Sequence, residues 1–288
     1  MTTPATPPSP PYPAPASTPP ASVPTGGPVS AVPVRTPGLG DAVAAEWTKI
    51  RSVRSTMWTL GVMVLLLLGV GLLTAFTLRV SESDLEGEPV LSLGFFGVLL
   101  GSICVITLGV LTMASEYSTG LIRTTLAACP GRGRVLIAKS IVFFLLSFTV
   151  TTVTAGIVGV LQTAILDAES PSGGEWLRVT VGVGLYVALL GLLSLALGTI
   201  VRHSAGAITI MIAVVLLPLV MAMFMFTPTL TSVRQALFEY SIPSQLAALY
   251  DTAMTLSGPS GWESVAIIAG VTAVAMCGAF VSLDRRDV

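Results

Sequence analysis

The sequence predicts an all-α membrane protein: six transmembrane helices with both termini in the cytoplasm, preceded by an N-terminal interfacial helix. Of its 288 residues, 10% are charged and 53% are hydrophobic, whereas a soluble domain carries about 25% charged residues. The apolar residues gather into six runs, each near the ~20 residues that cross a ~30 Å hydrocarbon core. None of these runs alternates like a barrel strand, so only helices satisfy their backbone groups in lipid. This composition excludes an ordinary cytosolic enzyme.

Residues 1–40 hold 13 of the 20 prolines. Such a segment buries too little apolar surface to offset its ordering entropy, so we expect a disordered, proline-rich cytoplasmic tail. It lacks a basic stretch followed by an apolar one, and therefore does not read as a signal peptide. A ligand for a proline-reading domain is the alternative to a bare spacer. The transmembrane domain is expected over residues 41–288.

Residues 41–57 are expected to form a helix with Asp41 as a possible N-cap. Its apolar positions lie along one stripe at helical spacing: Val43, Trp47, Ile50 and Met57. Lys49, Arg51 and Arg54 place positive charge directly before the first apolar run. This combination favours a helix that lies in the membrane interface. A plain basic flank of the first span is the alternative.

Six apolar runs without any Asp, Glu, Lys or Arg are the expected membrane spans. They are Trp58–Leu78, Val90–Met113, Ser140–Leu166, Val179–Val201, Ala205–Phe226 and Ser264–Leu283. We expect the third span to start earlier, near Val135, with Lys139 at the interface. In the second span, Gly97 and Gly101 form a G-x-x-x-G pattern that lets helices approach closely, either within the chain or between two copies.

The charges of the connecting segments predict the orientation. The N-terminal region, the segments near 114–139 and 202–204, and the C-terminal tail hold 11 of the 14 Lys and Arg and 5 of the 15 Asp and Glu, a net charge of +6. The other three loops hold 3 basic and 10 acidic residues, a net charge of −7. The positive-inside rule assigns the basic side to the cytoplasm.

The spans carry no obvious energy-coupling or catalytic chemistry. They contain Gln162, serines and threonines, but no titratable acid, base or histidine, which argues against a proton-relay carrier. Residues 133–140, GRVLIAKS, resemble the phosphate loop G-x-x-x-x-G-K-[ST], but Ala138 replaces its second glycine and no strand precedes it. Catalytic motifs and metal-ligand patterns of Cys and His are also missing. The sequence therefore predicts neither an enzyme nor a cofactor held by this chain.

The cytoplasmic loop 114–134 is the most informative connecting segment. It opens with Glu116 and Tyr117, and a helix of ~15 Å is expected over Thr119–Ala128, ended by Pro130 and the glycine after it. Such a helix either transmits a push from a soluble partner to the spans or lies on the lipid surface as an amphipathic connector.

Two segments carry a resemblance to a known family: EWTKIRSVRSTMW (46–58) and EYSTGLIRTTLAACPGRGRVLIAKS (116–140). They resemble ABC-2 type permeases of actinobacterial ABC transporters, and the likeness extends from about Asp41 to the C-terminus. It implies a six-helix permease domain in the bacterial plasma membrane, paired with a second permease copy as a homodimer or with a related permease. It also implies separate ATP-binding subunits, which hold the ATP and Mg.

The resemblance assigns roles to two sets of residues. The interfacial connecting helix comprises Glu46, Trp47, Lys49, Arg51 and Arg54, and the ATPase-coupling loop comprises Glu116, Tyr117, Thr119, Gly120, Leu121, Ile122, Arg123 and Leu126. The outer loop 227–263 is expected to hold short re-entrant helices, in agreement with the helical spacing of Leu230, Val233, Leu237 and Tyr240 before the break at Ile242-Pro243-Ser244-Gln245. The implied function is ATP-driven export across the lipid bilayer, without nucleic acid as a partner. The alternative is an ion-coupled secondary transporter or channel that acts without ATP.

Overall fold

The computed structural model describes residues 38–81, 87–121, 124, 131–252 and 258–285. Every regular element in this part of the chain is helical, and six of its helices are long and apolar enough to cross a membrane. The predicted class, an all-α membrane protein with six candidate spans, is therefore confirmed. The predicted tail lies almost wholly outside the described residues, and its last two residues belong to the first helix.

The candidate spans follow the predicted runs but reach further at their ends. They are α2 (Arg54–Val80), η1 with α3 (Val90–Gly94 and Phe95–Thr119), α5 (Arg132–Leu166), α6 with η2 and α7 (Gly173–Leu177, Arg178–Gly182 and Val183–Val201), α8 (Ser204–Phe224) and α11 (Gly261–Arg285). The fourth helix starts well before the predicted Val179, because Ser172 and Glu175 form a reciprocal capping box. It then passes through a π-helical turn at η2.

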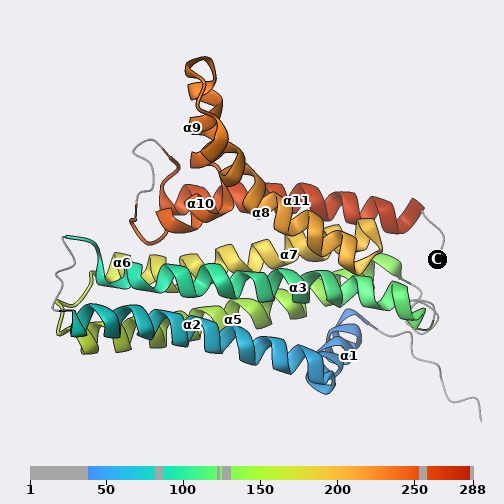
Figure 1. The fold of residues 1–288 in the computed structure, drawn as a ribbon. Helices are drawn as coiled ribbons and strands as arrows, with labels where there is room; N and C mark the ends of the chain where they lie inside the picture. The colour runs from blue at the N-terminus through green and yellow to red at the C-terminus, as the bar shows by residue number, and fades with distance from the viewer. Residues whose placement is uncertain (1–37, 82–86, 122–123, 125–130, 253–257, 286–288) are drawn as a thin grey trace, which may run out of the picture. The chain divides into compact units, whose positions relative to one another are not determined.

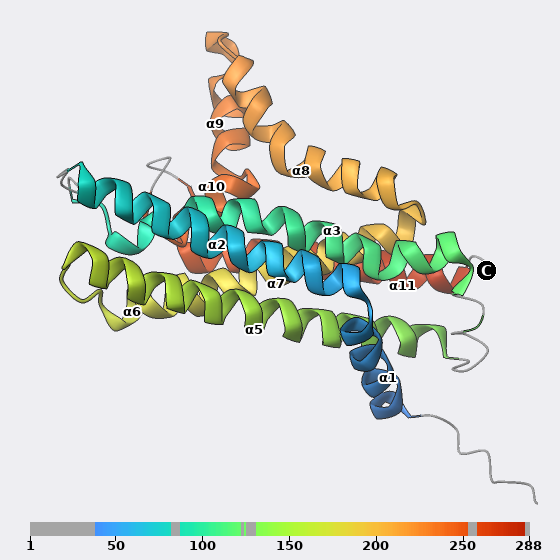
Figure 2. The same ribbon diagram turned by 60° about the horizontal axis from the view of Figure 1, so that its bottom comes forward.

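The helix α7 lies at the centre of the bundle, packed against α3, α5 and α11 (Figures 1 and 2). Glycines let its backbone touch α3: a Cβ added to Gly198 would lie 2.8 Å from the carbonyl oxygen of Val110, and one added to Gly109 would collide with that of Gly191. Small residues at a helix crossing allow such close approach in membranes. The α3–α7 pair is therefore the tightest backbone contact in the described core.

The G-x-x-x-G glycines of α3 face another helix of the same chain. A Cβ on Gly97 would lie 3.0 Å from the carbonyl oxygen of Leu67, and one on Gly101 would collide with the Leu67 side chain. Both glycines are buried against α2. Of the two alternatives that the sequence left open, within-chain packing is the one seen here.

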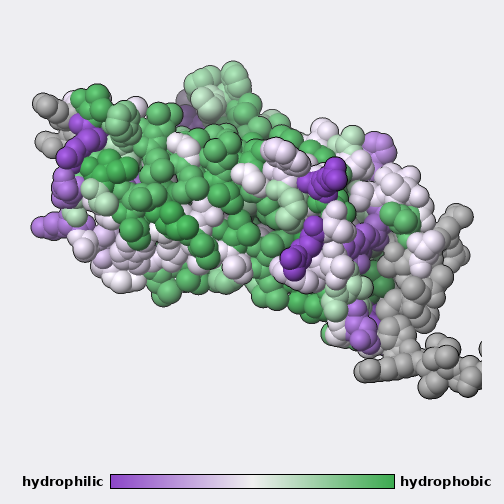
Figure 3. Space-filling view, turned by 90° about the horizontal axis from the view of Figure 1, so that it is seen from below, coloured by the Kyte–Doolittle hydropathy of each residue, from purple (hydrophilic) through white to green (hydrophobic). Residues whose placement is uncertain are grey.

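The spans run alternately between two ends of the bundle. Figure 1 shows α1 (Leu39–Ser52) and the last turns of α11 at the same end, here called the α1 end. The other end, called the far end, carries η1 and α6. Apolar residues cover the middle of the face shown in Figure 3, and hydrophilic residues gather toward its two ends. Such an apolar middle is the surface expected of helices surrounded by lipid.

The predicted outer loop 227–263 contains a short 3-10 turn, η3 (Pro228–Leu230), and two short helices, α9 (Thr231–Glu239) and α10 (Ile242–Ala248). The predicted break after Tyr240 is present. The same residues also start α10, because the hydroxyl of Ser241 accepts a hydrogen bond from the Ser244 backbone N–H and Pro243 sits in the first turn. In both views α8 diverges from the other spans, and α9 returns alongside it (Figures 1 and 2).

Candidate functional site: a buried ion cluster at the α1 end

The predicted helix 41–57 is divided between two helices, α1 and α2. The helix α1 ends at Ser52, and Val53 adopts an extended backbone with φ −84° and ψ 109° before α2 begins at Arg54. Of the predicted apolar stripe, Ile50 is buried, and Met57 falls on the second helix. The residues of α1 that are buried are Glu46 and Ile50, whereas Trp47 is 45% exposed. The helix therefore turns a carboxylate, rather than its tryptophan, toward the rest of the protein.

That carboxylate belongs to a cluster of four charged side chains from three helices. The Nζ of Lys139 on α5 lies 2.8 Å from Oε2 of Glu46 on α1 and 2.6 Å from Oε1 of Glu116 on α3. Lys49 on α1 also binds Oε1 of Glu116. The relative exposure of Lys139 and Glu116 is 1% each, and that of Glu46 is 7%. We call these residues, Glu46, Lys49, Glu116 and Lys139, the ion cluster.

The ion cluster is expected to fix the arrangement of its helices more than to raise the free energy of unfolding. Two acids and two bases balance one another, so the buried group carries no formal net charge. Desolvation offsets much of the attraction in such a group, but removing one partner leaves a buried charge uncompensated and typically destabilises by about 3–5 kcal/mol. The cluster therefore holds α1, the end of α3 and the start of α5 in one arrangement.

Lys139, which was expected at the membrane interface, turns its side chain into the protein. Lys139 lies on the buried face of α5, one turn after Val135 and one turn before Phe143. Glu116 likewise follows Met113 on the buried face of α3. A signal was present in the sequence: acids and bases occupied apolar helix faces at helical spacing, with opposite signs on different helices. An assignment by hydropathy alone ends each apolar run before a charged residue, and therefore leaves Glu116 and Lys139 outside the spans.

A second contact holds the last turn of α3 from its other side. The guanidinium carbon of Arg202, at the end of α7, lies 4.8 Å from the centre of the Tyr117 ring. This is within the range of a cation–π interaction. An Nη of Arg202 also donates a hydrogen bond of 3.4 Å to the backbone oxygen of Ser282 on α11. The neighbours Glu116 and Tyr117 thus connect α3 to α1, α5 and the end of α7, and Arg202 extends this connection to α11.

The rest of the predicted coupling loop is only partly described. The helix α3 continues to Thr119, and Gly120 ends it in a left-handed conformation with φ +72°. Residues 114–119 therefore belong to α3, and the helix that was expected from about Thr119 can begin only after Gly120, where Leu121 and Thr124 are helical. Leu121 is exposed. Ile122, Arg123 and Leu126 lie outside the described residues. On α1 and α2, Arg51 and Arg54 are exposed.

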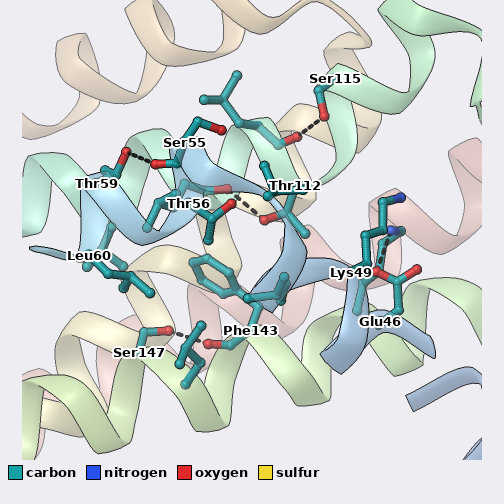
Figure 4. A pocket seen from close by; sticks show the side chains of 17 residues that line it. Glu46, Lys49, Ser55, Thr56, Thr59, Leu60, Thr112, Ser115, Phe143 and Ser147 are labelled. Carbon is teal, nitrogen blue, oxygen red and sulfur yellow. Dashed lines mark hydrogen bonds and ion pairs between the residues drawn. The ribbon is translucent and has the colours of Figure 1, made fainter. Parts of the chain in front are cut away.

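A cavity of about 310 Å³ adjoins the ion cluster, between α1, α2, α3 and α5. Figure 4 shows Glu46 and Lys49 at one end of this cavity, and Leu60 and Thr59 at the other, with the Phe143 ring between them. Among the described residues, no three His, Cys, Asp or Glu side chains lie close enough together to hold a metal ion. The lining of the cavity combines charged and hydroxyl side chains with aliphatic and aromatic ones, so it offers both hydrogen bonds and apolar contact.

Comparison with protein-family models finds no match, and comparison with curated proteins finds none either. The fold and the ion cluster define the class of protein: a multi-pass helical membrane protein with a buried set of charges at one end of its bundle.

Proposed function

We propose that this chain is the membrane-spanning permease subunit of an ATP-driven ABC transporter that exports its cargo, powered by separate ATP-binding subunits. The observation that carries the proposal is the ion cluster. It joins the two segments on which the family resemblance rests, since Glu46 and Lys49 lie in the first, and Glu116 and Lys139 lie in the second. A permease needs a mechanical connection between the surface that meets its ATPase and the helices that move.

The geometry supplies such a connection. Residues 120–131 link α3 to α5, and buried charges anchor the helices on both sides of this link. The last turn of α3 is held in addition by Arg202. A partner that displaces the link must therefore move α1, α3, α5 and α7 together, or break buried ion pairs. In this proposal the α1 end faces the cytoplasm, in line with its excess of basic residues, and a second permease copy completes the path.

The ion cluster also favours one alternative. Buried carboxylates inside membrane proteins mark proton and ion pathways in many carriers, and Glu116 is almost wholly buried within a candidate span. A secondary transporter that exchanges protons at Glu116 is therefore the second candidate. It differs from the first in its energy source.

The experiment is purification of the tagged full-length chain from its native membrane, followed by transport assays in proteoliposomes. We expect a Walker-motif ATP-binding subunit to co-purify, and the complex to show vanadate-sensitive ATP hydrolysis that the chain alone lacks. ATP hydrolysis by the isolated chain would contradict the proposal. So would uptake driven by a pH gradient in vesicles without ATP, which would establish the secondary transporter.

A substitution in the ion cluster distinguishes a role in coupling to ATP hydrolysis from a role in assembly alone. Glu116→Gln keeps the shape of the side chain and removes the charge that binds both lysines. We expect it to lower cargo-stimulated ATP hydrolysis at least tenfold while the ATP-binding subunit still co-purifies. Glu169→Gln is the matched control, because Glu169 is an exposed acid at the far end. Equal coupling in both variants would remove the ion cluster from the mechanism.

A further inference from the structure

The cavity beside the ion cluster has a charged end that is incompletely satisfied. Glu46 lines the cavity, and its side chain is 9% exposed. Its Oε2 accepts a hydrogen bond from Lys139, whereas its Oε1 has no hydrogen-bond partner among the described residues. An ionised carboxylate oxygen has lone pairs for further hydrogen bonds, and the Oε1 of Glu46 is not among the buried side-chain atoms without a partner. The cavity thus presents a free anionic acceptor of the kind that an ammonium group would satisfy.

A cation lies next to this acceptor. Lys49 lines the same end of the cavity, and its side chain is 37% exposed. An ammonium group carries three N–H donors, and within the described residues the Lys49 ammonium makes one hydrogen bond, to Glu116. The charged end therefore offers an acceptor for a cation and donors for an anion side by side.

The hydroxyl groups of the lining divide into two kinds. Those of Thr59, Thr112, Ser115 and Ser147 donate to backbone carbonyls of their own helices, which is the usual way in which helical hydroxyls are satisfied. In contrast, the hydroxyls of Ser55 and Thr56 make no hydrogen bond within the described part of the chain. Both lie in the first turn of α2, so their donors remain available to oxygen atoms of a ligand.

The remaining wall is apolar, and the charge balance restricts the ligand further. Aliphatic and aromatic side chains complete the lining: Leu60, Val105, Leu108, Leu111, Phe143 and Leu146. Because the ion cluster is neutral, a head group with a net charge would add an uncompensated charge beside the buried carboxylate of Glu46. A zwitterion adds none, and its two charges match the free carboxylate oxygen and the ammonium donors.

We infer that this cavity binds one zwitterionic phospholipid with a primary amine head group, of the phosphatidylethanolamine class. Its ammonium meets Glu46, its phosphate meets Lys49 with the hydroxyls of Ser55 and Thr56, and its glycerol region lies toward Leu60. The volume of about 310 Å³ suits a head group and glycerol, not two acyl chains. The lipid is a resident ligand, and the inference does not depend on an ATPase partner.

The test is native mass spectrometry of the full-length chain in detergent, titrated separately with phosphatidylethanolamine, phosphatidylcholine and phosphatidylglycerol. We expect one bound phosphatidylethanolamine, at about a tenfold lower concentration than either other lipid. Phosphatidylcholine has a bulky head without N–H donors, and phosphatidylglycerol has a net negative charge. Equal occupancy by all three lipids would show binding as annular lipid only and would overturn the inference.

Substitutions locate the site. Thr59→Trp fills the cavity from α2 without touching the ion cluster, and we expect it to abolish the selective adduct. Thr77→Trp is the matched control, since it lies 18 residues further along α2, five turns away on the same side of the helix. Glu46→Gln should reduce the preference for phosphatidylethanolamine over phosphatidylcholine at least fivefold. Retention of the selective adduct in Thr59→Trp would overturn the assignment, whatever the stability of Glu46→Gln.

Discussion

The two ends of the bundle use ion pairs of the same chemistry in opposite surroundings. At the α1 end, Lys139 is 1% exposed and binds two carboxylates. At the far end, Arg79 lies 2.6 Å from Asp167, but these side chains are 53% and 76% exposed. Exposed pairs contribute little because water competes with them, whereas a buried pair penalises the loss of either partner. The comparison shows that the burial of an ion pair, rather than its presence, decides whether it holds the neighbouring helices in one arrangement.

The largest expected effect is at the centre of the ion cluster. Lys139→Met keeps the length of the side chain but leaves two buried carboxylates without their shared cation. We expect the free energy of unfolding to fall by about 3–5 kcal/mol, measured by SDS titration with intrinsic tryptophan fluorescence. Lys49→Met is the comparison, because Lys49 is more exposed and Glu116 keeps its bond to Lys139. If both substitutions cost the same, burial is not the deciding variable.

A smaller effect is expected at the other side of α3. Tyr117→Leu removes the ring that lies beneath Arg202, and should lower stability by about 0.5–2 kcal/mol. Tyr117→Phe retains the ring face, and should therefore retain most of that stability. The same unfolding titration measures both variants. A loss in Tyr117→Phe as large as that in Tyr117→Leu would assign the effect to the hydroxyl instead of the cation–π contact.

The smallest effect is expected at the far end. Arg79→Ala removes a pair with Asp167 that is exposed on both sides, so the change should be about 0.2–1 kcal/mol and should shrink further in 0.5 M salt. The effect of Lys139→Met should change much less with salt, because screening acts weakly on buried charges. A large, salt-independent loss in Arg79→Ala would remove the contrast between the two ends.

The spans were predictable because the hydropathy and the length of an apolar run can be read directly from consecutive residues. The short helices after α8 were partly predictable, since Ser241 and Pro243 give local start signals. Charged residues on apolar helix faces were visible in the sequence, but their pairing in the ion cluster was not predictable, because its members are separated by up to 93 residues and meet only after the helices pack. The break at Val53 was also missed. No proline or glycine lies between Asp41 and Val53, and the extended backbone there has no local signature.

The glycine-mediated contact between α3 and α7 has a mechanical consequence. With backbone resting on backbone at Gly198, no layer of compressible side chains separates these two helices. Neither helix can therefore approach the other more closely there, and α3 and α7 are expected to move together. The helix α8, which diverges from the other spans (Figure 2), has no such close backbone contact at its glycine, and it is with α11 among the candidate spans that are least buried inside the protein.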